Sequence, residues 1–143
     1  PHPSPVLTKL AENLINEIDP SIRIIKNVEL YKLINDCEVL ITFNNSTTTL
    51  DAISMNKPVI SLQTDSYANE DDIAQAGAIL SISEIKELEN GIKKILYDND
   101  FKKKLMEKSD LFLQKYMKNQ GHASESVVEV LSKNIWWISW IFL

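Results

Sequence analysis

Residues 40–62 read LITFNNSTTTLDAISMNKPVISL, and this stretch decides the predicted fold. The run at 39–41 is continuously apolar, as in a parallel strand that is covered on both faces. A polar turn, a helix opened by hydroxyl residues and a second apolar run at 59–62 follow. Such an arrangement forms an anion site, because free backbone N–H groups and the positive end of the helix dipole face the ligand. The stretch therefore predicts a phosphate-binding α/β unit.

Asparagine residues stand at both ends of the helix predicted within this stretch. Asn44 and Asn45 precede it, and asparagine takes left-handed or turn geometry almost as readily as glycine does. Asn56 stands where a left-handed residue would end the helix, and Pro58 prevents its continuation. These residues predict a short helix between two strands.

The rest of the chain alternates helical periodicity with short apolar runs. Helices are predicted at about 6–18, 28–34, 85–95, 101–116 and from 124 onward, and further strands at 22–25 and 78–82. This alternation predicts an α/β fold with a Rossmann-like, doubly wound and mostly parallel sheet. In such a sheet the ligand lies outside the carboxyl ends of the strands, which is where residues 43–49 and 63–70 fall.

Composition excludes several classes of protein. A formal charge of −5 and a pI near 5.0 argue against broad nucleic-acid binding, which needs a basic face. The single cysteine, Cys37, excludes an internal disulfide and fits a buried core position in a cytoplasmic protein. The chain has no Gly-rich dinucleotide fingerprint, P-loop, nucleophile elbow or metal-ligand cluster. We therefore expect no metal site and no resident cofactor.

The two ends of the 143-residue chain are unusual. There is no initiator methionine, so we expect the chain to begin partway into a larger protein. We predict one partial nucleotide-binding domain at 1–133 and an apolar tail at 134–143, which holds all three tryptophans. The tail is too short to span a bilayer. It can be read as a helix end that packs on another domain, a peripheral anchor at the inner membrane face, or an abnormal end from truncation or frameshift.

Two groups of side chains near the start of the central helix are candidates for ligand binding. Ser46, Thr47, Thr48 and Thr49 offer four successive hydroxyls to phosphate oxygens, whereas helix capping alone would need one of them. Asp51 is suited to accept hydrogen bonds from paired sugar hydroxyls, or to compensate the helix dipole, and spacing leaves both interpretations open.

A histidine and a lysine complete the set of candidate ligand-binding residues. His2 lies between two prolines just before a helix start, where it is either an exposed histidine or a phosphate ligand and acid–base group. Lys57 is either solvated or available to a phosphate.

Three segments together resemble the donor-binding half of GT-B glycosyltransferases. They are DCEVLIT at 36–42, NSTTTLDA at 45–52 and NKPVI at 56–60, and the family form is an aspartate-led strand, Ser-Ser/Thr-x-x-x-Glu-Ala and Gly-Lys-Pro-Val-Ile. The His2-Pro3 pair resembles the Lys-x-His-Pro segment of capsule-polysaccharide sugar transferases and CDP-glycerol glycerophosphotransferases. The resemblance covers about residues 1–131.

The resemblance implies roles for particular residues. Asn45, Ser46, Thr47 and Thr48 would bind the phosphates of a nucleotide-sugar or CDP-polyol donor, Asp51 its ribose, and His2 would act catalytically beside the phosphates. The chain departs from the family form at Asp51, which is one methylene shorter than glutamate, and at Asn56, which replaces glycine. Phe43 stands where many retaining transferases carry an acid.

The resemblance also implies a protein larger than this chain. The family sheet has a central strand ahead of His-Pro, so we expect the first strand of the sheet to be missing here. An N-terminal acceptor domain would be a further partner, and the chain alone would not turn over substrate. Two alternatives stay open: a nucleotide-sugar 2-epimerase-like domain, whose Asp-Ser-Gly-Gly turn is replaced by the residues at 44–47, and a truncated inactive remnant or interaction module.

Overall fold

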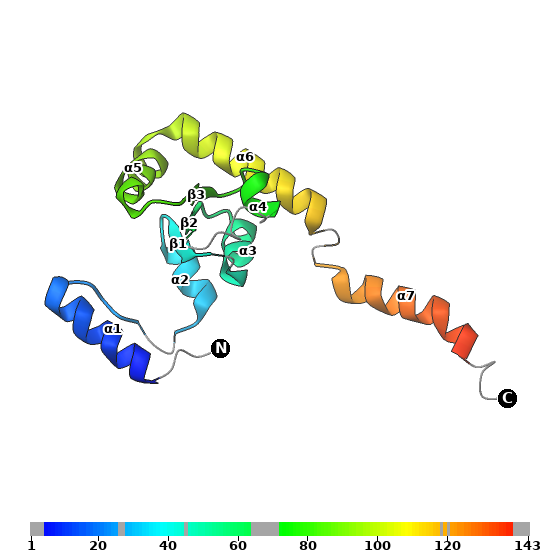
Figure 1. The fold of residues 1–143 in the computed structure, drawn as a ribbon. Helices are drawn as coiled ribbons and strands as arrows, with labels where there is room; N and C mark the ends of the chain where they lie inside the picture. Colours follow the sequence, from blue (N-terminus) through cyan, green and yellow to red (C-terminus); the bar gives the residue numbers. More distant parts are fainter. Residues whose placement is uncertain are drawn as a thin grey trace. The chain divides into compact units, whose positions relative to one another are not determined.

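The computed structural model describes residues 5–25, 28–44, 46–63, 72–117, 119 and 121–138. The chain forms two compact units, Pro1–Leu33 and Ile34–Leu143. The first unit contains helix α1 (Pro5–Ile18), and helix α2 (Leu30–Asp36) begins in the first unit and ends in the second (Figure 1). All of the strands of the described residues lie in the second unit.

The first unit confirms one sequence prediction and contradicts another. Helix α1 begins at Pro5, a first-turn position that suits proline because the missing N–H would have no partner there. The strand predicted at 22–25 is wrong, because these residues have no strand geometry, and Ile22 and Ile25 are each 49% exposed. A strand needs a neighbour to pair with its backbone, and a short apolar run cannot supply one by itself.

The second unit contains a parallel sheet of three strands in the described part of the chain. Strands β1 (Leu40–Phe43), β2 (Val59–Leu62) and β3 (Leu80–Ile82) lie in the order β1-β2-β3. Leu40 is in register with Val59, and Ile60 with Leu80. The predicted α/β class with a parallel, Rossmann-like sheet is therefore confirmed.

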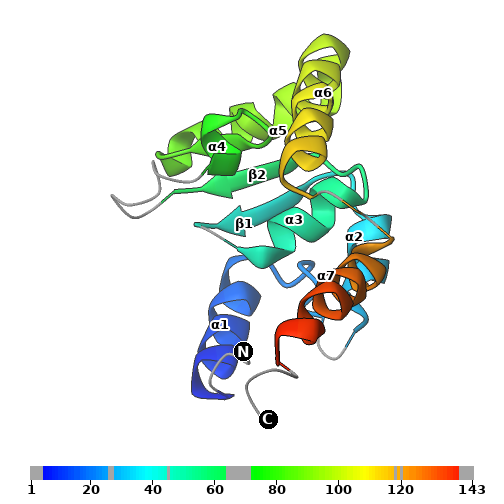
Figure 2. The same ribbon diagram turned by 90° about the vertical axis from the view of Figure 1, so that its right-hand side faces the viewer.

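Helices pack on both faces of β2, whose residues are all buried. Successive side chains of a strand point to opposite faces, and Val59 and Ile60 accordingly belong to different core clusters. The cluster around Val59 includes side chains of helices α3 (Thr47–Ser54), α4 (Asp72–Gln75) and α6 (Asn99–Tyr116). The cluster around Ile60 includes α5 (Leu88–Tyr97), which the 3₁₀ turn η2 (Ile85–Glu87) precedes, and the first turns of α6. Figure 2 shows α3 alongside β1 and β2.

Strand β1 is less covered than its sequence predicts. Ile41 is 38% exposed and Phe43 is 66% exposed, whereas Thr42 between them is buried. Since successive side chains of a strand point to opposite faces, the described residues cover β1 on the face of Thr42 and leave the face of Ile41 and Phe43 accessible. Cys37, expected in the core, is half-buried at the end of α2, where its thiol donates to the backbone oxygen of Ile34.

Helix α7 (Ala123–Ile138) runs across the boundary predicted at residue 133. The side chains from 134 onward and the backbone from 139 onward lie outside the described residues, so the interpretations of the tail stay predictions. In the part of the chain that the structure describes, no helix combines the length and the apolar character needed to cross a membrane.

Candidate functional site

The turn from β1 into α3 has the geometry that its two asparagines predict. Asn44 is left-handed, with φ 49°, and its N–H donates to the backbone oxygen of Leu62 on the neighbouring strand. Ser46 is the N-cap residue of α3 in extended geometry, with φ −102° and ψ 131°, but its side chain makes no capping hydrogen bond. The first N–H groups of α3 lack partners within the helix, as at any helix start. The hydroxyl of Ser46 is therefore not engaged in capping.

The hydroxyls that follow divide between two faces of α3. Thr49 is 4% exposed, and its oxygen lies 3.4 Å from that of the buried Thr42 on β1. Thr47 is exposed, and Thr48 and Asp51 are half-buried. Because residues three and four apart share a helix face, these three side chains lie together on the accessible side. Helix capping does not explain these side chains. The face that they form can offer hydroxyls and N–H groups to phosphates and a carboxylate to sugar hydroxyls.

Buried polar side chains gather at the carboxyl ends of β1 and β2. Among the described residues, four of the five buried polar side chains belong to this group: Thr42, Thr49, Ser61 and Gln63. Thr42 and Ser61 are partners in the register of the two strands. The core clusters, in contrast, consist of apolar residues. The buried polar side chains of β1 and β2 therefore lie at the end of the sheet where α3 begins.

A chain of hydrogen bonds connects this polar group to the turn. The side-chain Nε2 of Gln63 donates to Ser61 Oγ over 3.0 Å, and Ser61 Oγ donates to the backbone oxygen of Asn44 over 3.1 Å. The backbone N–H of Gln63 donates to Ile82, which ties the end of β2 to β3 as well. These bonds fix the ends of the strands against the turn at Asn44.

The far end of α3 has a purely structural arrangement. Asn56 is left-handed, with φ 57°, as predicted. The N–H of Asn56 donates to Ile53 and that of Lys57 donates to Ala52, which is the Schellman pattern of helix ends. Lys57 is half-buried, and its ammonium group donates to the backbone oxygens of Asn35 and Cys37. These carbonyls lie at the end of α2, and Lys57 contacts them from beyond the C-terminal end of α3, whereas the candidate hydroxyls lie at the start of α3.

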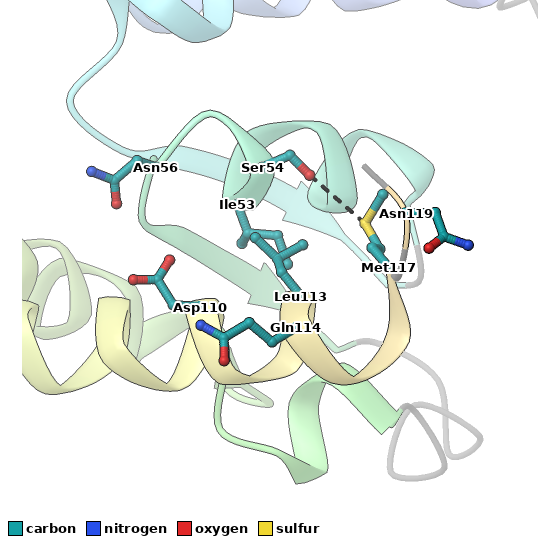
Figure 3. A pocket seen from close by; sticks show the side chains of 8 residues that line it. All are labelled: Ile53, Ser54, Asn56, Asp110, Leu113, Gln114, Met117 and Asn119. Atoms are coloured by element: carbon teal, nitrogen blue, oxygen red, sulfur yellow. Dashed lines mark hydrogen bonds between the residues drawn. The ribbon is translucent and has the colours of Figure 1, made fainter. Parts of the chain in front are cut away.

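A hollow of about 450 Å³ also lies at this far end. Figure 3 shows the C-terminal part of α3, with Ile53, Ser54 and Asn56, facing Asp110 and Leu113 of α6. The hydroxyl of Ser54 contacts the sulfur of Met117 there, at 3.8 Å. The hollow does not include Ser46, Thr47, Thr48 or Asp51, so it is separate from the candidate site.

Two predicted site residues, His2 and Asn45, lie outside the described residues. The structure brings Ser46, Thr47, Thr48 and Asp51 onto one helix but leaves their proposed contacts with a ligand as predictions. His122 is exposed and lies 2.7 Å from Glu125 at the start of α7. No group of three or more His, Cys, Asp or Glu within the described ranges is arranged to hold a metal ion.

Sequence reasoning missed Thr42 and Ser61 as parts of the site, and it included Gln63 only as the first residue of the stretch 63–70 at the ligand end of the sheet. One signal was available, since LITF and VISL each carry a hydroxyl residue at the third position of an apolar run. A parallel register places such positions side by side, as the structure confirms. The sequence did not show that the Gln63 side chain turns back to donate to Ser61 Oγ on the same strand.

Together, the parallel sheet and the helices on both of its faces define an α/β domain of the Rossmann-like class. A family model described as LIC12162 family transferase matches residues 1–76, which is more than half of the 143-residue chain and includes the whole candidate site. The chain belongs to this family of transferases. Searches of curated proteins and of solved structures gave no match to the chain.

Proposed function

We propose that the chain is the donor-binding region of a GT-B glycosyltransferase or glycerophosphotransferase. Its substrate would be a nucleotide-activated sugar or polyol, and its product part of a surface polysaccharide such as a capsule. Membership of a transferase family supports the reaction class. The parallel sheet with helices on both faces supports the proposed half of a GT-B fold.

The observation that carries the proposal is the accessible face of α3. Ser46 has a hydroxyl that does not cap the helix, and Thr47, Thr48 and Asp51 follow on one side of the same helix. Phosphate oxygens accept hydrogen bonds from N–H and O–H groups, and the positive end of the helix dipole favours their charge. One turn further on, the carboxylate of Asp51 is suited to ribose hydroxyls.

This arrangement supports a simple catalytic contribution. As the acceptor forms a bond to the sugar or polyol phosphate, the bond to the nucleotide mono- or diphosphate breaks and negative charge develops on the departing phosphate oxygens. Hydrogen-bond donors that are already aimed at those oxygens stabilise the charge without reorganising. In the proposal His2 adds a further donor beside the phosphates, and a separate acceptor-binding domain supplies the remaining half of the cleft.

Binding of nucleotides to the 143-residue chain tests this function without requiring turnover. We expect saturable binding of at least one of UDP, CDP and CMP in calorimetric titrations. Failure of all three to bind the folded chain would contradict the proposed function.

A further inference from the structure

Gln63 carries a buried carbonyl oxygen that has no partner among the described residues. The residue directly follows β2 and is 9% exposed. In the part of the chain that the structure describes, Gln63 Oε1 is buried and forms no hydrogen bond. Most buried polar atoms of native proteins are paired, so an unpaired one needs an explanation.

The hydrogen-bond chain determines which atom of the Gln63 amide is unpaired. Ser61 has one hydroxyl hydrogen, which it donates to the backbone oxygen of Asn44. Ser61 Oγ must then accept from the neighbouring amide, so the atom of Gln63 that faces it is Nε2. If the amide were rotated by 180°, Gln63 Oε1 would face Ser61 Oγ, and neither oxygen would have a hydrogen to donate to the other. The oxygen is therefore the atom of the amide that lacks a partner among the described residues.

An amide oxygen accepts hydrogen bonds and cannot donate them. Phosphate oxygens near neutral pH are acceptors too, so they cannot pair with Gln63 Oε1. An O–H or N–H group on the organic part of a nucleotide-activated ligand can. A ligand whose phosphates lie at the start of α3 would bring such groups close to the ends of the strands.

We propose that Gln63 Oε1 accepts a hydrogen bond from an O–H or N–H group of the ligand, which makes Gln63 a specificity-determining residue. The inference rests on the proposed function and deepens it. Ser61 acts as the positioning residue, because it holds the amide in one orientation against the β1–α3 turn. Gln63 distinguishes a nucleotide ligand from a bare diphosphate, whereas the hydroxyls of α3 bind both.

The test compares the chain with its Gln63→Met variant, in which a side chain of similar length lacks both polar atoms. The probes are pyrophosphate, UDP, CDP, UDP-N-acetylglucosamine and CDP-glycerol. We expect the dissociation constant of a nucleotide ligand to rise about tenfold, or 1.4 kcal/mol, with that of pyrophosphate unchanged. Weaker UDP or CDP binding would locate the partner group on the nucleoside. A loss confined to the two activated forms would locate it on the transferred group.

A stability measurement separates ligand recognition from a structural role. Gln63→Met removes a buried carbonyl that is unpaired within the described residues, and it also removes the Nε2 hydrogen bond to Ser61. Because these two effects on stability oppose each other, the variant should unfold at a denaturant concentration close to that of the parent. A clearly less stable or unfolded variant would overturn the proposal, since the amide would then serve the fold. Gln114→Met, at an exposed position of α6, is the matched control and should bind every probe as the parent does.

The outcomes also separate this inference from the function on which it rests. If the parent chain binds none of the nucleotide ligands, the proposed function fails. If the parent binds and Gln63→Met binds equally well, or loses pyrophosphate binding to the same extent, the inference about Gln63 alone fails.

Discussion

The ammonium group of Lys57 lies 2.6 Å from the backbone oxygen of Asn35 and 3.1 Å from that of Cys37. Carbonyl groups at the end of a helix lack partners within it, and a cation is favourable there. Lys57 therefore joins the end of α2 to the segment that leads from α3 into β2. The lysine of the Asn-Lys-Pro-Val-Ile segment thus has a structural explanation that needs no ligand.

Replacing Lys57 should lower stability and leave nucleotide affinity unchanged. We expect Lys57→Met to lose about 1–2 kcal/mol of unfolding free energy, because charge-assisted hydrogen bonds to two carbonyls disappear. Urea unfolding measures this loss, with Lys103→Met on the exposed face of α6 as the control. Normal stability together with weaker nucleotide binding would instead show that Lys57 serves the ligand.

The backbone geometry of Asn56 predicts different stabilities for its glycine and alanine variants. At φ 57° a side chain with a Cβ is strained, and glycine is not. We expect Asn56→Gly to unfold close to the parent and Asn56→Ala to lose about 1 kcal/mol. Equal stabilities of the two variants would contradict the assigned helix end.

Ser109 lies in the core, and its buried hydrogen bond predicts that its replacement lowers stability. Its side chain is fully buried, and its hydroxyl donates to the backbone oxygen of Ala78, which leads into β3. Ser109→Ala leaves that oxygen buried without this partner, so we expect a loss of about 1–3 kcal/mol in thermal or urea unfolding. Ser132→Ala on the exposed face of α7 removes a hydroxyl that donates to Glu129, and should change stability little. A similar small effect at Ser109 would argue against the contact between α6 and the segment before β3.

Local patterns were sufficient to predict much of the fold. Features within a few residues of each other predict three parts of the structure: the bounds of β2, the start of α3 after Ser46 and the left-handed geometry of Asn56. Apolar runs, capping positions and turn residues act at that range. Asn56 takes the left-handed geometry that glycine often supplies at a helix end, for the same local reason.

Features that depend on distant neighbours could not be predicted. The run at 22–25 has strand composition but no strand geometry, and the run at 39–41 did not reveal that Ile41 would be exposed. Pairing and coverage are properties of the assembled sheet. The same holds for the site: the sequence indicated the hydroxyls of α3, whereas the polar pair Thr42 and Ser61 became visible only through the strand register.

The central claim is that the accessible face of α3 binds the phosphates and ribose of a nucleotide. Calorimetric titration of the 143-residue chain with UDP, CDP and CMP, repeated on a Thr48→Val, Asp51→Ala double variant, tests it most directly. We expect at least one nucleotide to bind the parent, and its binding to weaken by about 2–4 kcal/mol in the double variant. Ser54→Ala, an exposed hydroxyl at the other end of the same helix, should bind as the parent does. Equal affinity of the parent and a folded double variant, or no nucleotide binding at all, would contradict the account.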